Sequence, residues 1–309
     1  MIGEIITNHK NYESNTIITV GLCVRNCEQT IEEVANGIVS QDFPHELMEI
    51  IIVDGYSSDR TVKIATEVFS KTKIKTSLYS ENIGLGFARQ IVVNNALGKY
   101  ILWVDGDIIL SNNYAKQLVD FMNEHPNVAI SVGSLGIMQD DNWIALLETI
   151  GYVIESLKKQ GKATLTLLGT KASILRTRAI RMIGGFDTNI KGAQEDVDVA
   201  EKLQLAGWKF FIINAVFYEM QKKTWNALWK RHFWYGYGLH FVKHKNVERN
   251  ILTSKSNDWI ILSSLAYKLT HRKVVFLMPL NFLFRKISLI FGFFMAHLDG
   301  YGHSNKKQS

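Results

Sequence analysis

The chain has 309 residues, of which 47% are apolar and 21% are charged, and its formal net charge is +6. This length and composition allow a full hydrophobic core in one large α/β domain, or in a domain with an appendage. Two cysteines, Cys23 and Cys27, are too few for a disulfide framework or a cysteine zinc site, so we expect free thiols in a reducing compartment. Residues 1–15 contain no basic segment followed by an apolar one, and we therefore expect no export signal.

Apolar, β-branched runs alternate with segments of helical spacing through the first hundred residues. The expected strands are Thr16–Val24, Met48–Val53, Ile74–Tyr79 and Tyr100–Val104. The expected helices are Ile31–Val39, Arg60–Phe69 and a segment from Gly86 to about Leu97. Strands and helices that alternate at this spacing predict a mostly parallel sheet with helices on both faces.

Polar residues follow three of these strands at the point where each strand ends. They are Arg25, Asp54 and the pair formed by Asp105 and Asp107. Open α/β sheets bind ligands at the carboxyl ends of their strands, so we expect one crevice that gathers all four side chains. Two carboxylates separated by Gly106 suit Mg²⁺ or Mn²⁺, because these ions prefer oxygen ligands. Alone, the same sequence is also typical of a simple Asp-Gly turn.

Gly84 and Gly86 match part of a dinucleotide-binding fingerprint, but Arg89 stands where the third glycine would be. The chain also lacks a glycine-rich phosphate loop that ends in Lys-Ser or Lys-Thr, so neither an NAD enzyme nor an ATPase is favoured. One turn into its helix, Arg89 is placed to reach a diphosphate together with the helix N-terminus. The alternative is an arginine on a solvated helix face.

The middle of the chain continues the alternation of helices and strands. We expect helices at Ser111–Glu124 and Trp143–Lys159, and strands at Val128–Val132, Trp208–Ile213 and Ala215–Tyr218. The acidic segment Gln194-Glu195-Asp196-Val197-Asp198 opens a further helix, Val199–Leu205. Acidic residues in a first turn favour the helix dipole, and this effect alone can explain them. The functional alternative is that one of them is a general base facing the metal site.

Five segments resemble the motifs of family 2 glycosyltransferases of the GT-A fold, in the same order and spacing. They are VDGYSSD (53–59), NIGLGFARQ (82–90), DGD (105–107), GGFD (184–187) and QEDVD (194–198). The resemblance covers roughly Thr16 to Trp234 and implies a Rossmann-like α/β catalytic domain at residues 16–221. A leader at 1–15 and a C-terminal region at 222–309 would flank it. The family's reaction is an inverting transfer of a sugar from a nucleoside diphosphate sugar.

Residue by residue, the resemblance implies a donor site at the strand ends. Asp54 would recognise the nucleobase, with Cys23 and Arg25 lining the same pocket. Arg89 matches the family's Ala-Arg pair after the glycines and would neutralise charge on the departing diphosphate. Asp105 would contact the ribose or the metal side of the donor.

The resemblance also implies a metal site and a base. Asp107 would bind Mn²⁺ or Mg²⁺ beside Asp105. Glu219 stands after the last strand, where the family often has a metal-binding histidine, and a carboxylate can also bind the metal. Asp196 would be the general base, with Glu195 beside it, and would take the acceptor's proton during in-line displacement.

The chain departs from the family pattern at two further places, and the second of these bears on whether the enzyme is processive. The family often has a second acidic residue where this chain has Gly55. Processive members carry a Gln-x-x-Arg-Trp motif, and residues 230–234 keep only its last residue, Trp234. We therefore expect transfer of a single sugar and not polymerisation.

The composition shifts beyond Trp225, where aromatic and basic residues are interleaved. No Asp or Glu occurs from Trp259 to Leu298, and two apolar runs, Val274–Phe284 and Ile287–Leu298, flank Arg285 and Lys286. Each run is shorter than the ~20 residues of a spanning helix, and charges within a fused span would be costly. We therefore expect separate helices in the membrane interface, with basic residues facing anionic lipid. Within the first run, Pro279 should kink or end a helix.

The sequence thus predicts a monotopic glycosyltransferase at the cytoplasmic face of the cell membrane. Its donor would be GDP-mannose or UDP-glucose, and its acceptor a lipid-linked or glycolipid molecule. One alternative is a soluble transferase whose C-terminal helices form an oligomer interface. Another is a catalytically silent nucleotide-sugar-binding scaffold, which the intact Asp105, Asp107 and Asp196 argue against. Long aliphatic runs argue against a nucleic-acid partner, because stacking platforms do not need them.

Overall fold

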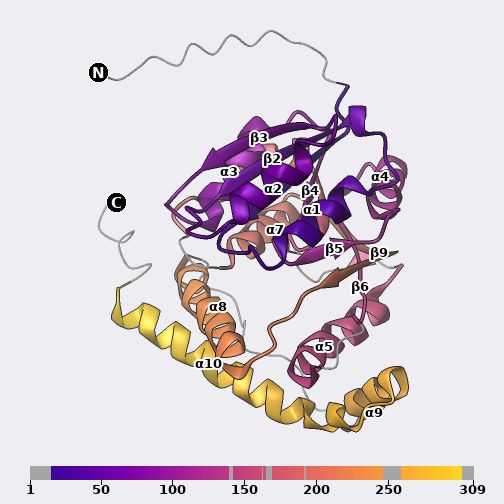
Figure 1. Ribbon diagram of the computed structural model, residues 1–309. Coiled ribbons are helices and arrows are strands. Elements are labelled where there is room, and N and C mark those ends of the chain that lie inside the picture. Colours follow the sequence, from indigo (N-terminus) through magenta and orange to yellow (C-terminus); the bar gives the residue numbers. More distant parts are fainter. Residues whose placement is uncertain are drawn as a thin grey trace.

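The computed structural model describes residues 15–138, 142–161, 163–164, 169–190, 193–245 and 259–300. The expected leader, apart from Asn15, lies outside the described residues. A sheet of nine strands forms the centre of the molecule (Figure 1), and its strand order is β3-β2-β1-β4-β8-β6-β9-β5, with β7 paired to β9. The strands are β1 (Ile18–Val24), β2 (Met48–Asp54), β3 (Lys75–Ser80), β4 (Tyr100–Trp103), β5 (Ile108–Leu110), β6 (Val128–Leu135), β7 (Ala163–Thr164), β8 (Ser173–Arg176) and β9 (Lys209–Glu219).

Helices cover both faces of this sheet, as the alternating pattern predicted. They are α1 (Ile31–Val39), α2 (Thr61–Phe69), α3 (Leu85–Asn95), α4 (Tyr114–Glu124), α5 (Trp143–Lys159), α6 (Thr177–Met182), α7 (Glu195–Leu205), α8 (Trp225–Lys245), α9 (Trp259–Thr270) and α10 (Met278–Leu298). Two short 3₁₀ helices are η1 (His45–Leu47) and η2 (Lys273–Leu277). The α/β fold class is therefore confirmed.

Alternate residues of the central strands enter two separate cores. In β2, Ile50 and Ile52 pack in the core that includes α1 and α2, whereas Ile51 and Val53 pack in the core that includes α3 and α7. Successive side chains of a strand point to opposite faces of a sheet. Because both faces are covered, every residue of β2 is buried, which explains its uninterrupted apolar run.

The first four strands along the sheet are parallel, and the antiparallel strands come later in the chain. β1 pairs in parallel with β2 and β4, and β2 pairs in parallel with β3. The short strand β8 then enters antiparallel between β4 and β6, and β5 lies antiparallel to β9. The largest differences from the expected strands are that β6 extends to Leu135 and that the expected Trp208–Ile213 and Ala215–Tyr218 form the single strand β9.

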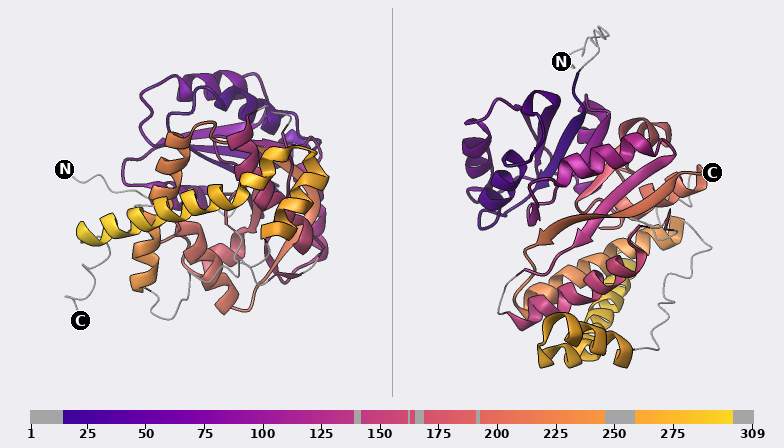
Figure 2. Two further views of the ribbon diagram at one scale, coloured as in Figure 1. Left: turned by 90° about the horizontal axis from the view of Figure 1, so that it is seen from below. Right: turned by 90° about the vertical axis from the view of Figure 1, so that its right-hand side faces the viewer.

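The C-terminal helices lie together on the side of the molecule opposite β1–β3 (Figure 2), with α10 running across that side. The expectation of two separate apolar helices was wrong, because the first run begins in η2 and continues into α10, and this single helix of 21 residues also contains the second run. Pro279 does not kink this helix because it lies in the first turn, where its missing N–H has no intrahelical partner to lose. Among the described residues, Lys273–Leu298 is the one segment long and apolar enough to cross a membrane, by length and composition alone.

The outer surface of α10 is apolar, and its inner surface is small and polar. Asn281, Ser288, Gly292 and Ala296 are buried against the rest of the protein. We call the opposite, exposed set the outer strip; it consists of Leu280, Leu283, Ile287, Ile290, Phe291, Phe294 and Leu298. This distribution is the reverse of that on an ordinary surface helix, which turns its large apolar side chains inward.

Candidate functional site

A cleft of about 840 Å³ opens at the carboxyl ends of β1 and β4, where the sequence predicted a ligand crevice. Arg25, Asp105 and Asp107 line it, together with Cys23 from the end of β1. Its opposite wall comes from the turn before β8, from the end of β9 and from α8. That wall contains Lys171, Glu219, Lys222, Lys230, Arg231, Trp234 and Tyr235.

Arg89 lines this cleft and forms ion pairs with two acidic residues. Its guanidinium is 4% exposed and forms ion pairs with the buried Glu195 and, at 3.1 Å, with Asp105. The segment that leads into α7 approaches α3 closely because α3 has a glycine at this contact. A Cβ at Gly86 would lie only 2.8 Å from the carbonyl oxygen of Asp187. Arg89 is therefore a buried cation of the site and not an arginine on a solvated face.

Asp107 and Glu219 are neighbours because β5 and β9 pair directly beside them. Ile108 is opposite Glu219 in the register, and the N–H of Met220 donates to the carbonyl of Asp107 at 2.8 Å. Arg231 lies between the two carboxylates, 3.2 Å from Glu219 and 3.4 Å from Asp107. Its guanidinium also donates to Gln221 Oε1 at 2.7 Å, so three groups fix its position.

Two lysines complete this charged set. Lys171 forms a close ion pair with Glu219, and Lys222 lies 3.6 Å from Asp107. Burial raises the pKa of Asp107 to about 6, with further contributions from Glu219 and Asp105. Burial also opposes ionisation of Glu219, yet Lys171 and Arg231 hold the pKa of that carboxyl below its usual value. The negative charge at Asp107 is therefore the less fully compensated of the two.

This electrostatic difference bears on where a divalent cation would fit. In the described part of the chain, no three His, Cys, Asp or Glu side chains form a group that could hold a metal ion. Mg²⁺, however, is usually bound by one or two carboxylates and by substrate phosphates, without an all-protein cage. Asp107 fits such a role because burial first, and then the negative charges of Glu219 and Asp105, raise the pKa of its carboxyl, and a divalent cation would offset these effects. Glu219 fits it less well, because Lys171 forms a close ion pair with it and Arg231 lies at 3.2 Å, whereas the two cations near Asp107 lie farther away, at 3.4 and 3.6 Å.

A smaller pocket of about 330 Å³ adjoins the cleft at the ends of β1 and β2. Cys23, Arg25, Gly55, Glu81 and Trp234 are among its lining residues. The Glu81 carboxylate accepts the N–H groups of residues 83 and 84 at 2.7 and 2.8 Å, and so shapes the loop before α3. The structure thus places two of the predicted nucleobase residues, Cys23 and Arg25, in one pocket.

Asp54 is turned away from both cavities. It does not line either of them, and its carboxylate accepts from the hydroxyl of Ser57 at 2.6 Å and from the N–H of Ser57 at 3.0 Å. Asp54 thereby closes the turn that follows β2. The two cysteines are free thiols, and burial raises the pKa of Cys23 to about 12, so this thiol enters the pocket uncharged.

Asp196 lies in the first turn of α7, beside the turn that leads to Lys171. Its carboxylate accepts the N–H of Thr170 at 3.4 Å, and a Cβ at Gly169 would overlap it at 2.3 Å. Glu195 faces the other way and pairs with Arg89. The two adjacent acids therefore have different surroundings: Glu195 pairs with a cation, whereas among the described residues Asp196 accepts only backbone N–H groups.

The family model described as glycosyl transferase family 2 matches residues 19–181, which is more than half of the chain. The chain belongs to this family. The matched part of this family 2 glycosyltransferase chain runs from β1 through α6 and contains Asp54, Arg89, Asp105 and Asp107. The resemblance noted from five short motifs is thereby confirmed.

Two curated relatives of this family 2 chain come from Staphylococcus aureus and Bacillus subtilis. The poly(ribitol-phosphate) β-N-acetylglucosaminyltransferase TarS of Staphylococcus aureus is 30% identical over 113 residues, which are 36% of this chain and 20% of TarS. The probable glycosyltransferase YdaM of Bacillus subtilis is 22% identical over 305 residues, which are 91% of this chain and 64% of YdaM. The chain therefore spans less than two thirds of the length of either relative.

A solved structure extends the likeness to nearly the whole chain. The mannosyltransferase PcManGT from Pyrobaculum calidifontis, in complex with GDP-Man and Mn²⁺, aligns with a TM-score of 0.62 and 18% identity. The alignment covers 94% of this chain and 88% of PcManGT. At this identity the likeness establishes the fold, and it confirms the GT-A architecture expected from the sequence motifs.

Sequence reasoning missed several residues that line the cleft. Arg231 and Lys222 were not among the expected donor-site residues, but both contact Asp107. Lys171 belongs to a Gly-Thr-Lys turn that carries no signal for a charged site. One feature of the sequence could have pointed to Arg231, because it stands three residues before Trp234, near the position of the family's Gln-x-x-Arg-Trp motif.

Proposed function

We propose that the protein transfers a single sugar, with inversion, from a nucleoside diphosphate sugar to a lipid-linked acceptor. The observation that carries this proposal is the joining of a nucleoside-sized pocket to a cleft that holds Arg89, Asp107 and Arg231. Such an arrangement suits a ligand with an uncharged base at one end and a diphosphate at the other. The proposed donors are GDP-mannose and UDP-glucose.

In this proposal Cys23 and Arg25 line the base pocket, and Asp54 acts by holding the turn after β2. Arg89, Arg231 and Lys171 face the diphosphate, and the first of these is held in place by Glu195 and Asp105. The PcManGT structure, in complex with GDP-Man and Mn²⁺, supports a donor and a metal of this kind on this fold. The catalytic part at 16–221 shares its cleft with the C-terminal part because α8 supplies Arg231.

Asp107 would hold Mn²⁺ or Mg²⁺ together with donor oxygens, and Asp105 would lie beside it. The bound cation would supply further positive charge for the departing diphosphate. Arg231 and Lys222 already contact the Asp107 carboxylate, so the metal ion would share this carboxylate with these two side chains. Glu219 has a different role in this proposal from the one first expected, because it orients Lys171 and Arg231.

Asp196 would act as the base on the acceptor side. The acceptor's hydroxyl oxygen forms a bond to the anomeric carbon, while the bond from that carbon to the diphosphate oxygen breaks. The bonding electrons leave with the nucleoside diphosphate, and the hydroxyl proton passes to the Asp196 carboxylate. Attack opposite to the leaving group inverts the anomeric centre. Arg89, Arg231 and Lys171 stabilise the charge that develops on the leaving oxygen.

The first test is donor binding to the full chain. The melting temperature is measured with GDP, UDP, GDP-mannose and UDP-glucose, each with Mn²⁺ or with EDTA. A ligand at 100 times its Kd adds about 2.7 kcal/mol to the free energy of unfolding, so one base should raise Tm clearly, and EDTA should remove the rise. If none of the four ligands raises Tm, the proposal fails. If they bind but no nucleoside diphosphate is released, the silent scaffold is the better description.

We also propose that the acceptor is presented at the cytoplasmic face of the cell membrane, where the outer strip of α10 contacts lipid. The strip has a large exposed apolar surface, with Leu280 64% and Phe294 56% exposed, which is uncommon for soluble monomers. Lys268 on α9, Lys273 on η2 and Lys286 on α10 are exposed, and no acid occurs between 259 and 298 to offset them. An apolar strip flanked by lysines suits an anionic bilayer.

Vesicle flotation tests this lipid contact. We expect the protein to float with phosphatidylglycerol-containing vesicles, and Leu280→Glu with Leu283→Glu to reduce the bound fraction about tenfold, because buried apolar area is lost and negative charge is added. Leu205→Glu is the matched control, since Leu205 is 82% exposed on α7, and it should float like the wild type. A wild type that does not float, yet forms dimers that the double substitution dissociates, would favour the oligomer interface.

A further inference from the structure

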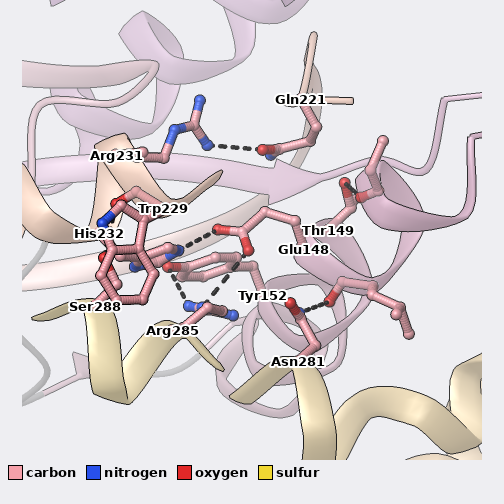
Figure 3. Close-up of polar contacts among 12 residues, drawn as sticks. Glu148, Thr149, Tyr152, Gln221, Trp229, Arg231, His232, Asn281, Arg285 and Ser288 are labelled. Atoms are coloured by element: carbon pink, nitrogen blue, oxygen red, sulfur yellow. Dashed lines mark hydrogen bonds and ion pairs between the residues drawn. The ribbon is translucent and has the colours of Figure 1, made fainter. Parts of the chain in front are cut away.

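A polar cluster is buried where α5, α8 and α10 meet (Figure 3). We call Glu148, Tyr152, His232 and Arg285 the junction cluster. Glu148 Oε1 lies 3.2 Å from His232 Nε2, and its other oxygen lies 3.5 Å from Arg285 Nε. Arg285 also donates to the hydroxyl of Tyr152 at 3.1 Å. The side chains of Glu148 and His232 are only 1% and 4% exposed.

Stability alone does not account for charges at this position. Aromatic contacts surround the cluster on α8 and α10, including those of Trp229 with Phe284 and Phe291. Replacing a buried ion pair by well-packed apolar residues is often neutral or stabilising. Removing one partner, in contrast, leaves an uncompensated charge and is costly. A buried pair of this kind therefore selects one arrangement of the three helices over its alternatives.

The backbones of α8 and α10 are in direct contact, so close packing also fixes the position of one helix relative to the other. A Cβ at Gly236 would lie 1.9 Å from the carbonyl oxygen of Leu289, and one at Gly292 would lie 1.9 Å from that of Phe233. Ser288 donates to the carbonyl of Trp229 at 2.7 Å. A small slide or rotation of α10 would therefore displace α8 as well.

The junction cluster reaches the cleft by two routes. His232 is the neighbour of Arg231 on α8, so the contact that holds His232 also sets the position of Arg231 between Asp107 and Glu219. The ring of Tyr152 is the second route. Arg285 lies over it at 5.4 Å and Lys171 at 5.0 Å, and Lys171 pairs with Glu219. Both cations that contact Glu219 are thus linked to the junction cluster, Arg231 through His232 and Lys171 through Tyr152.

We propose that Glu148 is a positioning residue that, through His232, Tyr152 and Arg285, holds Arg231 and Lys171 where they face the donor's diphosphate. This inference rests on the proposed function, because it requires a diphosphate in the cleft. It also gives α10 a role inside the protein as well as at its surface. The helix that carries the outer strip supplies Arg285, one of the two partners of Glu148.

A double-mutant cycle on nucleoside diphosphate affinity tests the proposal. The Kd for UDP and for GDP, with Mn²⁺, is measured by titration calorimetry for the wild type, Glu148→Gln, Arg231→Gln and the double variant. We expect Glu148→Gln to raise Kd about tenfold in the wild type and by clearly less once Arg231 is replaced, when only the route to Lys171 remains, because residues that act through one contact are not additive. A structural role alone would weaken both backgrounds equally. Glu155→Gln on the same helix, at an exposed pair with Lys159, should keep the wild-type Kd.

Two further outcomes are distinguished by the same measurements. If the wild type binds UDP or GDP and the two substitutions are additive, or Glu148→Gln keeps the wild-type Kd, the positioning role is overturned while the proposed function stands. If the wild type binds neither nucleotide, the proposed function fails and the positioning role fails with it. Should Glu148→Gln not fold, Tyr152→Leu is the second variant, since Tyr152 is 38% exposed. It should raise Kd by withdrawing support from Lys171, and an unchanged Kd would overturn the proposal.

Discussion

Replacing Asp196 with asparagine should lower kcat by about 10²–10⁴-fold, the usual contribution of a general base. The amide keeps the shape of the side chain, and its oxygen can still accept from Thr170, as Asp196 does at 3.4 Å. It cannot take a proton from the acceptor. The Kd for the nucleoside diphosphate should therefore stay within about twofold of the wild type, because the change removes an interaction made in the transition state. Release of nucleoside diphosphate, measured beside binding, separates the two effects.

The control for this substitution lies on the same helix. Glu201→Gln removes a carboxylate further along α7 and should leave kcat near the wild-type value. Wild-type turnover of Asp196→Asn would mean that another group accepts the proton. Glu195 is a poor alternative base, because it is buried and paired with Arg89. Replacing Glu195 should instead disturb Arg89 and weaken donor binding.

Much of the fold was predictable because apolar periodicity is a local property of the chain. The strands β1, β2 and β4 were expected nearly to the residue, since each is an apolar run with polar residues at its end. The antiparallel entry of β8 between β4 and β6 was not. No local pattern in Ser173–Arg176 states which strands it will join, because that choice depends on how the whole sheet closes.

The sequence indicated most of the acidic residues of the site but fewer of its basic residues. Asp105 and Asp107 follow a strand directly, so the end of β4 places them. Lys171 meets Glu219 across 48 positions of sequence, and Arg231 meets Asp107 across 124. Such contacts depend on the paths of β9 and α8 after the sheet has formed. Asp54 illustrates the same limit, since its position was correct but the turn at Ser57 decides where its carboxylate points.

The C-terminal region shows the difference between composition and orientation. Its apolar and basic character was evident from the sequence, but the direction of each side chain was not. Arg231 and Arg285 turn inward, to Asp107 and Glu148, whereas the large apolar residues of the outer strip turn outward. A charge in an apolar run was therefore no barrier to one continuous α10, because Glu148 and Tyr152 receive Arg285.

Replacing Asp107 with asparagine should abolish the effect of Mn²⁺ on donor binding. Loss of an outer partner of a metal site usually costs 10- to 100-fold in metal affinity, so loss of the proposed carboxylate itself should cost about 100-fold or more. In the wild type we expect EDTA to raise the Kd for the nucleoside diphosphate. In Asp107→Asn the Kd with Mn²⁺ and the Kd with EDTA should be the same. Calorimetric titration with UDP and GDP under both conditions measures this difference.

The same substitution should act in the opposite direction when no metal is present. Arg231 and Lys222 both contact Asp107, and removal of that negative charge leaves them free to attract a diphosphate more strongly. We therefore expect Asp107→Asn to bind the nucleotide in EDTA at least as tightly as the wild type does. Asp120→Asn, on the exposed side of α4, should retain the wild-type response to Mn²⁺. If Asp107→Asn keeps the full effect of Mn²⁺ on the Kd, the metal ion binds elsewhere. If it raises the Kd equally with Mn²⁺ and with EDTA, the role of Asp107 is only to position Arg231.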